Sequence, residues 1–154
     1  MLPPYAQDAK RLSLLFDFGV IAEREVIEWA DSQIVALASP PDALMQLAVT
    51  PPNKTEDIIT HLHTLGVEAE FCSAFTAALA QLHDHLVSHP ADAERIAPDL
   101  FNTIYALQTD IPDEFRFVNR YDDAFDLAKS GVCGDTETLR KEFIDELQKF
   151  KPVV

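Results

Sequence analysis

Apolar residues recur every three or four positions along most of the chain. The runs are Val26, Ile27, Ala30, Ile34 and Leu37; Phe71, Phe75, Leu79, Leu82 and Leu86; Leu100, Ile104 and Leu107; and Leu139, Phe143, Leu147 and Phe150. This spacing places apolar side chains on one face of an α-helix. The sequence shows no clear strand-like alternation and contains no Asn-Gly or Asp-Gly hairpin turn. The pattern therefore predicts an all-α protein.

Glycine and proline mark the ends of the expected helices. The chain has four glycines, and Gly19, Gly66 and Gly131 each follow an apolar run, where we expect them to end a helix. The ten prolines gather between the runs, and proline suits the first turn of a helix. Asn53, followed three positions later by Glu56, resembles a capping box that opens a helix.

These signals together predict seven or eight short helices joined by short turns. The expected spans are 5–18, 22–38, 41–49, 54–65, 68–88, 91–108, 112–130 and 135–150. Pro98 is expected to break or kink the sixth. We expect a single compact multi-helix array, with residues 1–154 forming one helical domain. A chain of this length buries about 68–70% of its unfolded surface, so it needs no disulfide or metal to fold.

The charge balance limits the choice of partners. Twelve Lys and Arg against 26 Asp and Glu give a formal net charge of −14. Residues 1–77 and 78–154 each carry a net charge of −7, so no acidic tail accounts for the imbalance. An acidic surface repels phosphate backbones, which argues against nucleic-acid binding. Solubility alone is the simplest explanation of such a charge.

Cysteine usage and hydropathy favour a cytoplasmic protein. Cys72 and Cys133 lie far apart, and neither belongs to a C-x-x-C pair. The chain opens Met1-Leu2-Pro3-Pro4 without a basic region and a long apolar stretch, which predicts no signal peptide. No apolar run is long enough to span a bilayer. We therefore expect a reduced, cytoplasmic protein with no membrane association.

The most specific acidic string is D-D-x-x-D, formed by Asp122, Asp123 and Asp126. On a helix, Asp122 and Asp126 lie one turn apart and could hold Mg²⁺ bridging a diphosphate. In this respect the string resembles the motif of all-helical isoprenoid synthases, but the second acidic motif of those enzymes is absent. Flanking cations at helical spacing suit ordinary ion pairs with the aspartates. These cations are Arg116, Arg120 and Lys129.

Other catalytic patterns are missing. His85 and His89 share a helix face and, with Asp92 or Asp84, could form part of a metal site. A favourable interaction of His89 with the dipole at a helix end is a sufficient explanation, however. The sequence contains no H-E-x-x-H, no G-x-S-x-G and no phosphate-binding glycine loop. We predict no cofactor, no resident metal and no catalytic residue.

One third of the chain resembles a known pattern. The residues that carry it are 15–21 (LFDFGVI), 25–31 (EVIEWAD), and Pro40 and Pro41 followed by Leu44 and Leu47. The pattern is similar to that of short, acidic, all-helical bacterial proteins to which no activity is attached. The resemblance implies an intact bacterial helical domain and carries over no catalytic residue.

The sequence therefore favours a non-enzymatic protein-interaction domain, and in its most specific form an immunity protein that neutralises a basic toxin. A small Mg²⁺-dependent phosphohydrolase that uses the D-D-x-x-D helix face is the alternative, and a homodimer whose helices pack against a second copy is a third interpretation. The predicted contact residues are Glu23, Glu25, Glu28, Asp31, Asp122, Asp123 and Asp126.

Overall fold

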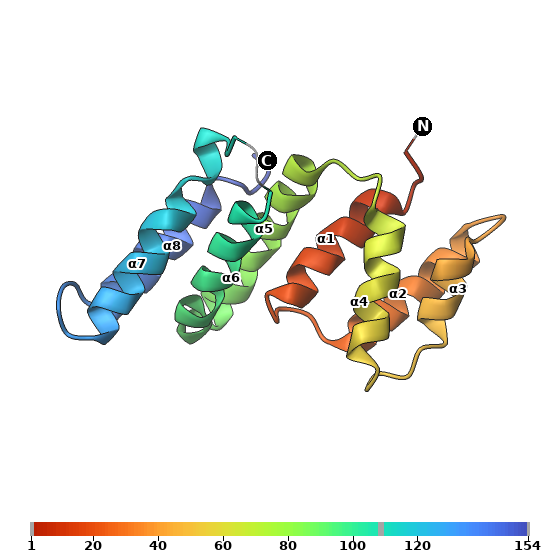
Figure 1. Ribbon diagram of the computed structural model, residues 1–154, viewed down its shortest axis with the longest axis horizontal. Helices are drawn as coiled ribbons and strands as arrows, with labels where there is room; N and C mark the ends of the chain where they lie inside the picture. The colour runs from red at the N-terminus through yellow and green to blue at the C-terminus, as the bar shows by residue number, and fades with distance from the viewer. Residues whose placement is uncertain (1, 108–109, 154) are drawn as a thin grey trace. The chain divides into compact units, whose positions relative to one another are not determined.

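The computed structural model describes residues 2–107 and 110–153, and all the regular secondary structure in this part of the chain is helical. The eight α-helices and two short 3₁₀ helices are labelled in chain order, and Figure 1 shows the α-helices. They are α1 (Ala6–Asp17), α2 (Glu23–Ala36), α3 (Asp42–Ala48), α4 (Thr55–Gly66), α5 (Phe71–Ser88), η1 (Pro90–Asp92), α6 (Ala93–Tyr105), η2 (Asp113–Phe115), α7 (Phe117–Lys129) and α8 (Thr136–Gln148). The prediction of an all-α array is confirmed.

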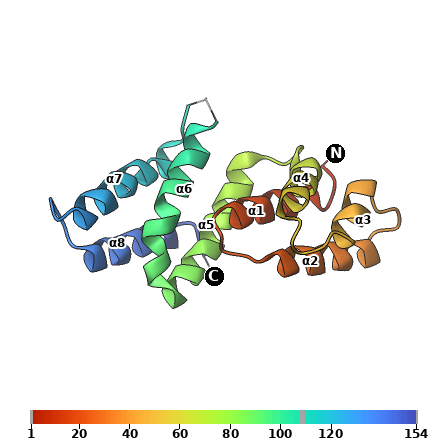
Figure 2. The same cartoon turned by 60° about the horizontal axis from the view of Figure 1, so that its bottom comes forward.

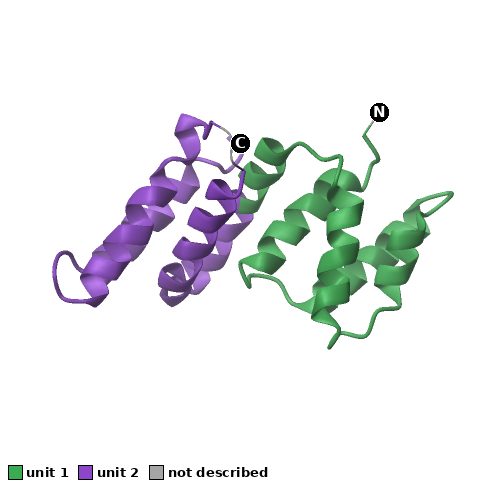
Figure 3. Cartoon of the chain, in the orientation of Figure 1, with its two compact units in different colours: residues 1–78 green, residues 79–154 purple. Residues whose placement is uncertain are grey.

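The chain divides into two compact units, which Figure 3 shows in different colours. Unit 1 is Met1–Ala78 and unit 2 is Leu79–Val154, so the division falls inside α5. A single domain over the whole chain stays a prediction. Within the described residues, no helix is long and apolar enough to cross a membrane.

Unit 1 has a mainly aliphatic core. Its α1 packs against α4, and α2 packs against α3 and α4. Figures 1 and 2 show α2 and α3 side by side in this unit. Helix α3 also contacts α4. The fully buried side chains of these helices are Ala6, Ala9, Leu15, Val26, Ala30, Leu44, Leu47, Ile58 and Leu62.

The core of unit 2 combines aliphatic side chains with a cluster of aromatic rings. Its α7 packs against both α6 and α8, while η1 contacts α6 and α8. Phe143 on α8 is fully buried and lies at the centre of this core. Its ring centroid is 5.2 Å from that of Tyr121 and 6.0 Å from that of Phe125, which it meets edge to face. Phe117 lies 6.3 Å from it and also contacts Phe150.

Gly19 and Gly131 end α1 and α7 as the sequence predicted. Their φ angles are 70° and 74°, a left-handed conformation that glycine adopts without steric cost. After α1, the Val20 N–H donates to the Leu15 carbonyl, and the Gly19 N–H donates to the carbonyl two residues before the C-cap. The same pair of hydrogen bonds follows α7. Both ends are therefore Schellman motifs.

The prediction for Gly66 was wrong. This residue is the last residue of α4 rather than the residue after it, and it is buried. A Cβ added at Gly66 would lie 2.9 Å from the backbone nitrogen of Lys10 on α1. The close approach of α1 and α4 therefore requires glycine at position 66. Gly66 is not needed there to end a helix.

Other expectations about helix ends need correction. The span predicted as 91–108 begins with η1 and continues as α6, while its expected end at residue 108 lies outside the described residues. The span predicted as 112–130 likewise begins with a 3₁₀ turn, η2, before α7. Pro98 does not break α6, because buried apolar residues on both sides of it hold the helix together. Asn53 does not cap α4, whose N-cap is Lys54 without a side-chain cap.

Candidate functional site

Three of the predicted acidic residues share the exposed face of α2. Glu25, Glu28 and Asp31 follow each other at three-residue spacing, so their side chains lie on one side of the helix. All three are exposed, and none forms an ion pair with another described residue. We call these three residues the α2 acidic face.

The core of unit 1 determines this orientation. Val26 and Ala30 of α2 are fully buried, one helical turn apart. The carboxylates therefore occupy the opposite side, together with Val35, whose side chain is 88% exposed. The α2 acidic face is thus a fixed surface of a regular helix, with one bare apolar residue at its C-terminal end.

The fourth predicted residue of α2, Glu23, lies elsewhere on the helix. It precedes Glu25 by two positions, a rotation of about 200° on a helix. Its carboxylate accepts a 3.4 Å hydrogen bond from the Thr55 hydroxyl at the start of α4, and the residue is half-buried. Glu23 therefore contributes to packing within unit 1 and does not belong to the α2 acidic face.

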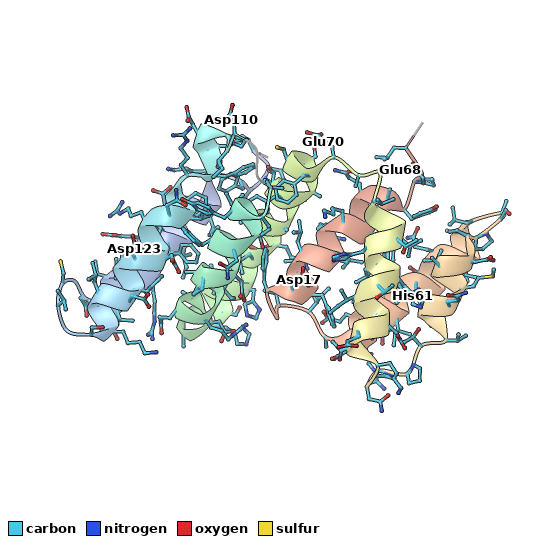
Figure 4. All side chains as sticks on the ribbon, viewed as in Figure 1. Asp17, His61, Glu68, Glu70, Asp110 and Asp123 are labelled. Atoms are coloured by element: carbon cyan, nitrogen blue, oxygen red, sulfur yellow. The ribbon has the colours of Figure 1, made fainter. Side chains whose placement is uncertain are left out.

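The D-D-x-x-D residues lie on α7 in unit 2. Asp123 and Asp126 are exposed, and Figure 4 shows Asp123 on the side of α7 that faces away from α6. Asp122 is half-buried. Partial burial raises the pKa of Asp122, and the charges of Asp126 and Asp123 raise it further. The three carboxylates therefore repel one another on one helix.

Two of the three cations expected to neutralise these aspartates bind other partners. Arg116 pairs with Asp113 at 3.0 Å, one turn towards the N-terminus. Arg120 pairs with Glu142 of α8 at 3.2 Å, and its guanidinium lies 5.2 Å from the Tyr121 ring. The prediction that these arginines pair with the D-D-x-x-D aspartates was therefore wrong, because contacts with η2 and α8 position them instead.

The histidine pair near the end of α5 forms a small polar cluster. His85 Nε2 lies 2.8 Å from the Asp92 carboxylate of η1, and the rings of His85 and His89 stack with centroids 4.7 Å apart. The hydrogen bond with His85 is the main reason why the pKa of Asp92 lies below its usual value, and the charge of Arg95 also lowers it. The cluster ties the end of α5 to the start of α6.

Metal-binding geometry does not arise from these acids and histidines. In residues 2–107 and 110–153, no three His, Cys, Asp or Glu side chains come together in a way that could hold a metal ion. The stacked imidazoles of His85 and His89 lie face to face, and His85 already bonds to Asp92. Neither the D-D-x-x-D string nor the histidine cluster therefore gains geometric support as a metal site.

Sequence reasoning missed the strongest ion pair of unit 2. The Arg140 guanidinium on α8 donates through Nε and Nη2 to both carboxylate oxygens of Glu94 on α6, the second bond measuring 2.8 Å. Forty-six positions separate the two residues, so no local spacing indicates the pair. The Lys151 ammonium likewise reaches Asp84 on α5 from beyond the end of α8.

The seven predicted site residues therefore fall into both units, four on α2 in unit 1 and three on α7 in unit 2. Their chemistry is that of hydrated carboxylates on helix faces, which can attract cations and basic protein surfaces. No protein-family model matches the chain, and neither the curated proteins nor the solved structures include a match to it.

Proposed function

We propose that this chain is a non-enzymatic protein-interaction domain that uses its acidic helical surface to bind a basic protein partner. In its most specific form, the proposal is that it acts in the cytoplasm as an immunity protein that neutralises a bacterial toxin. The observation that supports it best is the α2 acidic face, because Glu25, Glu28 and Asp31 are exposed and unpaired.

Electrostatics explain why unpaired carboxylates suit this role. A carboxylate already held by an internal cation must lose that contact before it can bind a partner, whereas the α2 acidic face loses only water. Complementary charge accelerates association of proteins and fixes their orientation, more than it adds affinity. The net charge of −14 extends the attraction for a basic partner beyond the contact surface.

Val35 adds an apolar contact beside the carboxylates. The Val35 side chain is 88% exposed, so its burial by a partner would stabilise the complex. The stabilisation is about 25 cal/mol per Å² of apolar surface removed from water. Val35 lies one turn after Asp31, on the same face. Interfaces commonly combine apolar and polar contacts, and Val35 beside the three carboxylates offers both kinds on one helix face.

The test is co-expression with the products of adjacent genes, followed by co-purification. We expect a basic product to bind and its association to slow steeply as the salt concentration rises, because salt screens exposed charges. The triple variant Glu25→Lys/Glu28→Lys/Asp31→Lys should then weaken binding by about 100-fold. Failure of every neighbouring product to bind would contradict the proposal.

A matched control separates the α2 acidic face from net charge. Asp42, Glu56 and Glu68 are also exposed and unpaired in unit 1, so converting all three to Lys changes the net charge by the same amount. We expect this control triple to lose far less affinity. Equal losses in the two triples would show that net charge acts alone and that the α2 acidic face is not the contact surface.

One observation bears on the α7 acidic residues as the site of a Mg²⁺-dependent phosphohydrolase. Burial and the charges of Asp126 and Asp123 raise the pKa of Asp122, and a divalent cation would relieve this repulsion. A screen of phosphate esters and nucleotides with Mg²⁺ or Mn²⁺ tests this second function. Turnover that Asp126→Ala abolishes would support it, and no turnover with either metal would contradict it.

A further inference from the structure

A small cavity in unit 2 brings together one face of α8 and the 3₁₀ helix η1. Its volume is about 220 Å³, and its lining residues are Pro90, Glu137, Arg140, Lys141 and Ile144. The four residues from α8 follow helical spacing, so they form one stripe along the helix. The volume is below the roughly 300–1,000 Å³ of sites for drug-sized ligands, so only a smaller molecule would fit.

The lining combines an apolar floor with separate charges. Pro90 and Ile144 supply apolar surface. Glu137 and Lys141 are four positions apart, the spacing at which opposite charges usually pair on a helix. Neither forms an ion pair with any residue of the described chain. The cavity is therefore bordered by one free carboxylate and one free ammonium group.

Arg140 gives the cavity a fixed wall. Two hydrogen bonds to the Glu94 carboxylate hold its guanidinium, so this side chain cannot collapse into the space. Its charge is balanced by Glu94, and the free charges of Glu137 and Lys141 also balance. A simple anion or a simple cation would therefore pair with only one of the two free charges.

We propose that this cavity binds a small zwitterion with an aliphatic side chain, that is, a free aliphatic amino acid. Lys141 binds the ligand's carboxylate, Glu137 binds its ammonium group, and Pro90 and Ile144 contact its side chain. The site is independent of the α2 acidic face. Such a ligand has about nine non-hydrogen atoms. At the binding free energy per atom that is usual for small ligands, we expect a Kd of about 1 mM.

The experiment is an NMR titration of the full ¹⁵N-labelled chain with L-leucine. We expect saturable shifts of backbone amide signals at 137–144 and at 91–92. N-acetyl-leucine lacks the ammonium group and leucinamide lacks the carboxylate, so each should bind at least about 10-fold more weakly. Glycine should also bind at least about 10-fold more weakly, because it has no side chain to contact the floor.

Two variants test which charged side chain binds which group of the ligand. Lys141→Gln should weaken leucine binding without changing the affinity for leucinamide, and Glu137→Gln should weaken leucine binding without changing the affinity for N-acetyl-leucine. Lys54→Gln in unit 1 makes the same charge change as Lys141→Gln and should leave leucine binding intact. Absence of saturable shifts at 50-fold the expected Kd, or equal affinity for leucine, N-acetyl-leucine and leucinamide, would overturn the proposal.

Discussion

The two units carry the same net charge but use their charged residues differently. Each has seven more acidic than basic side chains. In the described part of unit 2, six of the eight basic residues form ion pairs, two of them between α-helices. In unit 1, by contrast, the carboxylates of Glu25, Glu28 and Asp31 on α2 are exposed and form no ion pair with another described residue. The two units therefore have the same net charge, but ion pairs stabilise unit 2, whereas unit 1 has carboxylates without a partner.

The two units also differ in the side chains that fill their cores. Unit 1 is packed mainly by aliphatic residues of α1–α4, whereas aromatic rings on η2, α7 and α8 form the centre of unit 2. Aromatic side chains bury about 150–250 Å² each and contact their neighbours in specific geometries. Unit 2 therefore adds contacts between aromatic rings to its aliphatic packing, whereas unit 1 relies mainly on aliphatic contacts. Substitutions in both units test this comparison.

The largest effect is expected at Phe143. Phe143→Ala removes a ring that contacts three others, so we expect the free energy of unfolding to fall by about 3–5 kcal/mol. Urea denaturation followed by circular dichroism measures it. Leu127→Ala on α7 is the control, because its side chain is 45% exposed and should cost below about 1 kcal/mol. Similar losses in the two variants would contradict an aromatic core centred on Phe143.

Gly66→Ala tests the close approach of α1 and α4 in unit 1. The added methyl group would lie 2.9 Å from backbone atoms of Lys10, which cannot move aside as a flexible side chain can. Overpacking should cost about 1–3 kcal/mol, against which the better helix propensity of alanine offsets about 1 kcal/mol. We expect a net loss of up to about 2 kcal/mol in thermal or urea unfolding. A stabilised variant would show that the two helices separate at little cost.

This position also shows what the sequence could and could not predict. Gly19, Gly66 and Gly131 look alike in sequence, since each follows an apolar run. Two of them end helices through local hydrogen bonds, which depend only on neighbouring residues. The third is required by a contact with Lys10, fifty-six positions away, and local pattern contains no information about it. Helix positions were therefore predictable, and contacts between helices were not.

The same distinction between local spacing and contacts between helices applies to the predicted site residues. Glu25, Glu28 and Asp31 could be placed on an exposed helix face from their spacing around Val26 and Ala30. The spacing of Glu23 likewise shows that it lies on another side, but its bond to Thr55 depends on the packing of α4 against α2. Arg116 and Arg120 have helical spacing to the D-D-x-x-D aspartates, yet contacts with other elements determined their partners.

The ion pairs of unit 2 should differ in strength according to their exposure. Arg140 and Glu94 expose only 27% and 29% of their side chains and share two hydrogen bonds, whereas Arg120 and Glu142 are more exposed. We expect Arg140→Met to cost about 1–2 kcal/mol and Arg120→Met less than about 0.5 kcal/mol. Chemical denaturation of both variants at pH 7 measures the difference. Equal costs would show that the Arg140–Glu94 pair is an ordinary surface pair.

The same variant has a defined pH dependence. The hydrogen bond with Arg140 lowers the pKa of Glu94 from its usual value of 4.5, so the charged form is favoured in the folded state. The stability from this pair is fully present above the unfolded pKa and is lost as the pH falls through the lower folded value. The difference between wild type and Arg140→Met should therefore shrink below about pH 4.

The smallest effect should occur in the α2 acidic face, and this is where the two units contrast most directly. Glu28→Gln removes one unpaired charge, and because the carboxylate has no internal partner, the free energy of unfolding should change by less than about 0.5 kcal/mol. Asp135 is equally exposed, but its carboxylate accepts a 3.2 Å hydrogen bond from the Thr138 N–H at the start of α8. Asp135→Ala should cost about 1 kcal/mol, since it removes a helix cap. Parallel urea titrations of the two variants make the comparison. A loss at Glu28 as large as the loss at Asp135 would mean that α2 uses this carboxylate to stabilise the fold, and the α2 acidic face would then no longer be free for a partner.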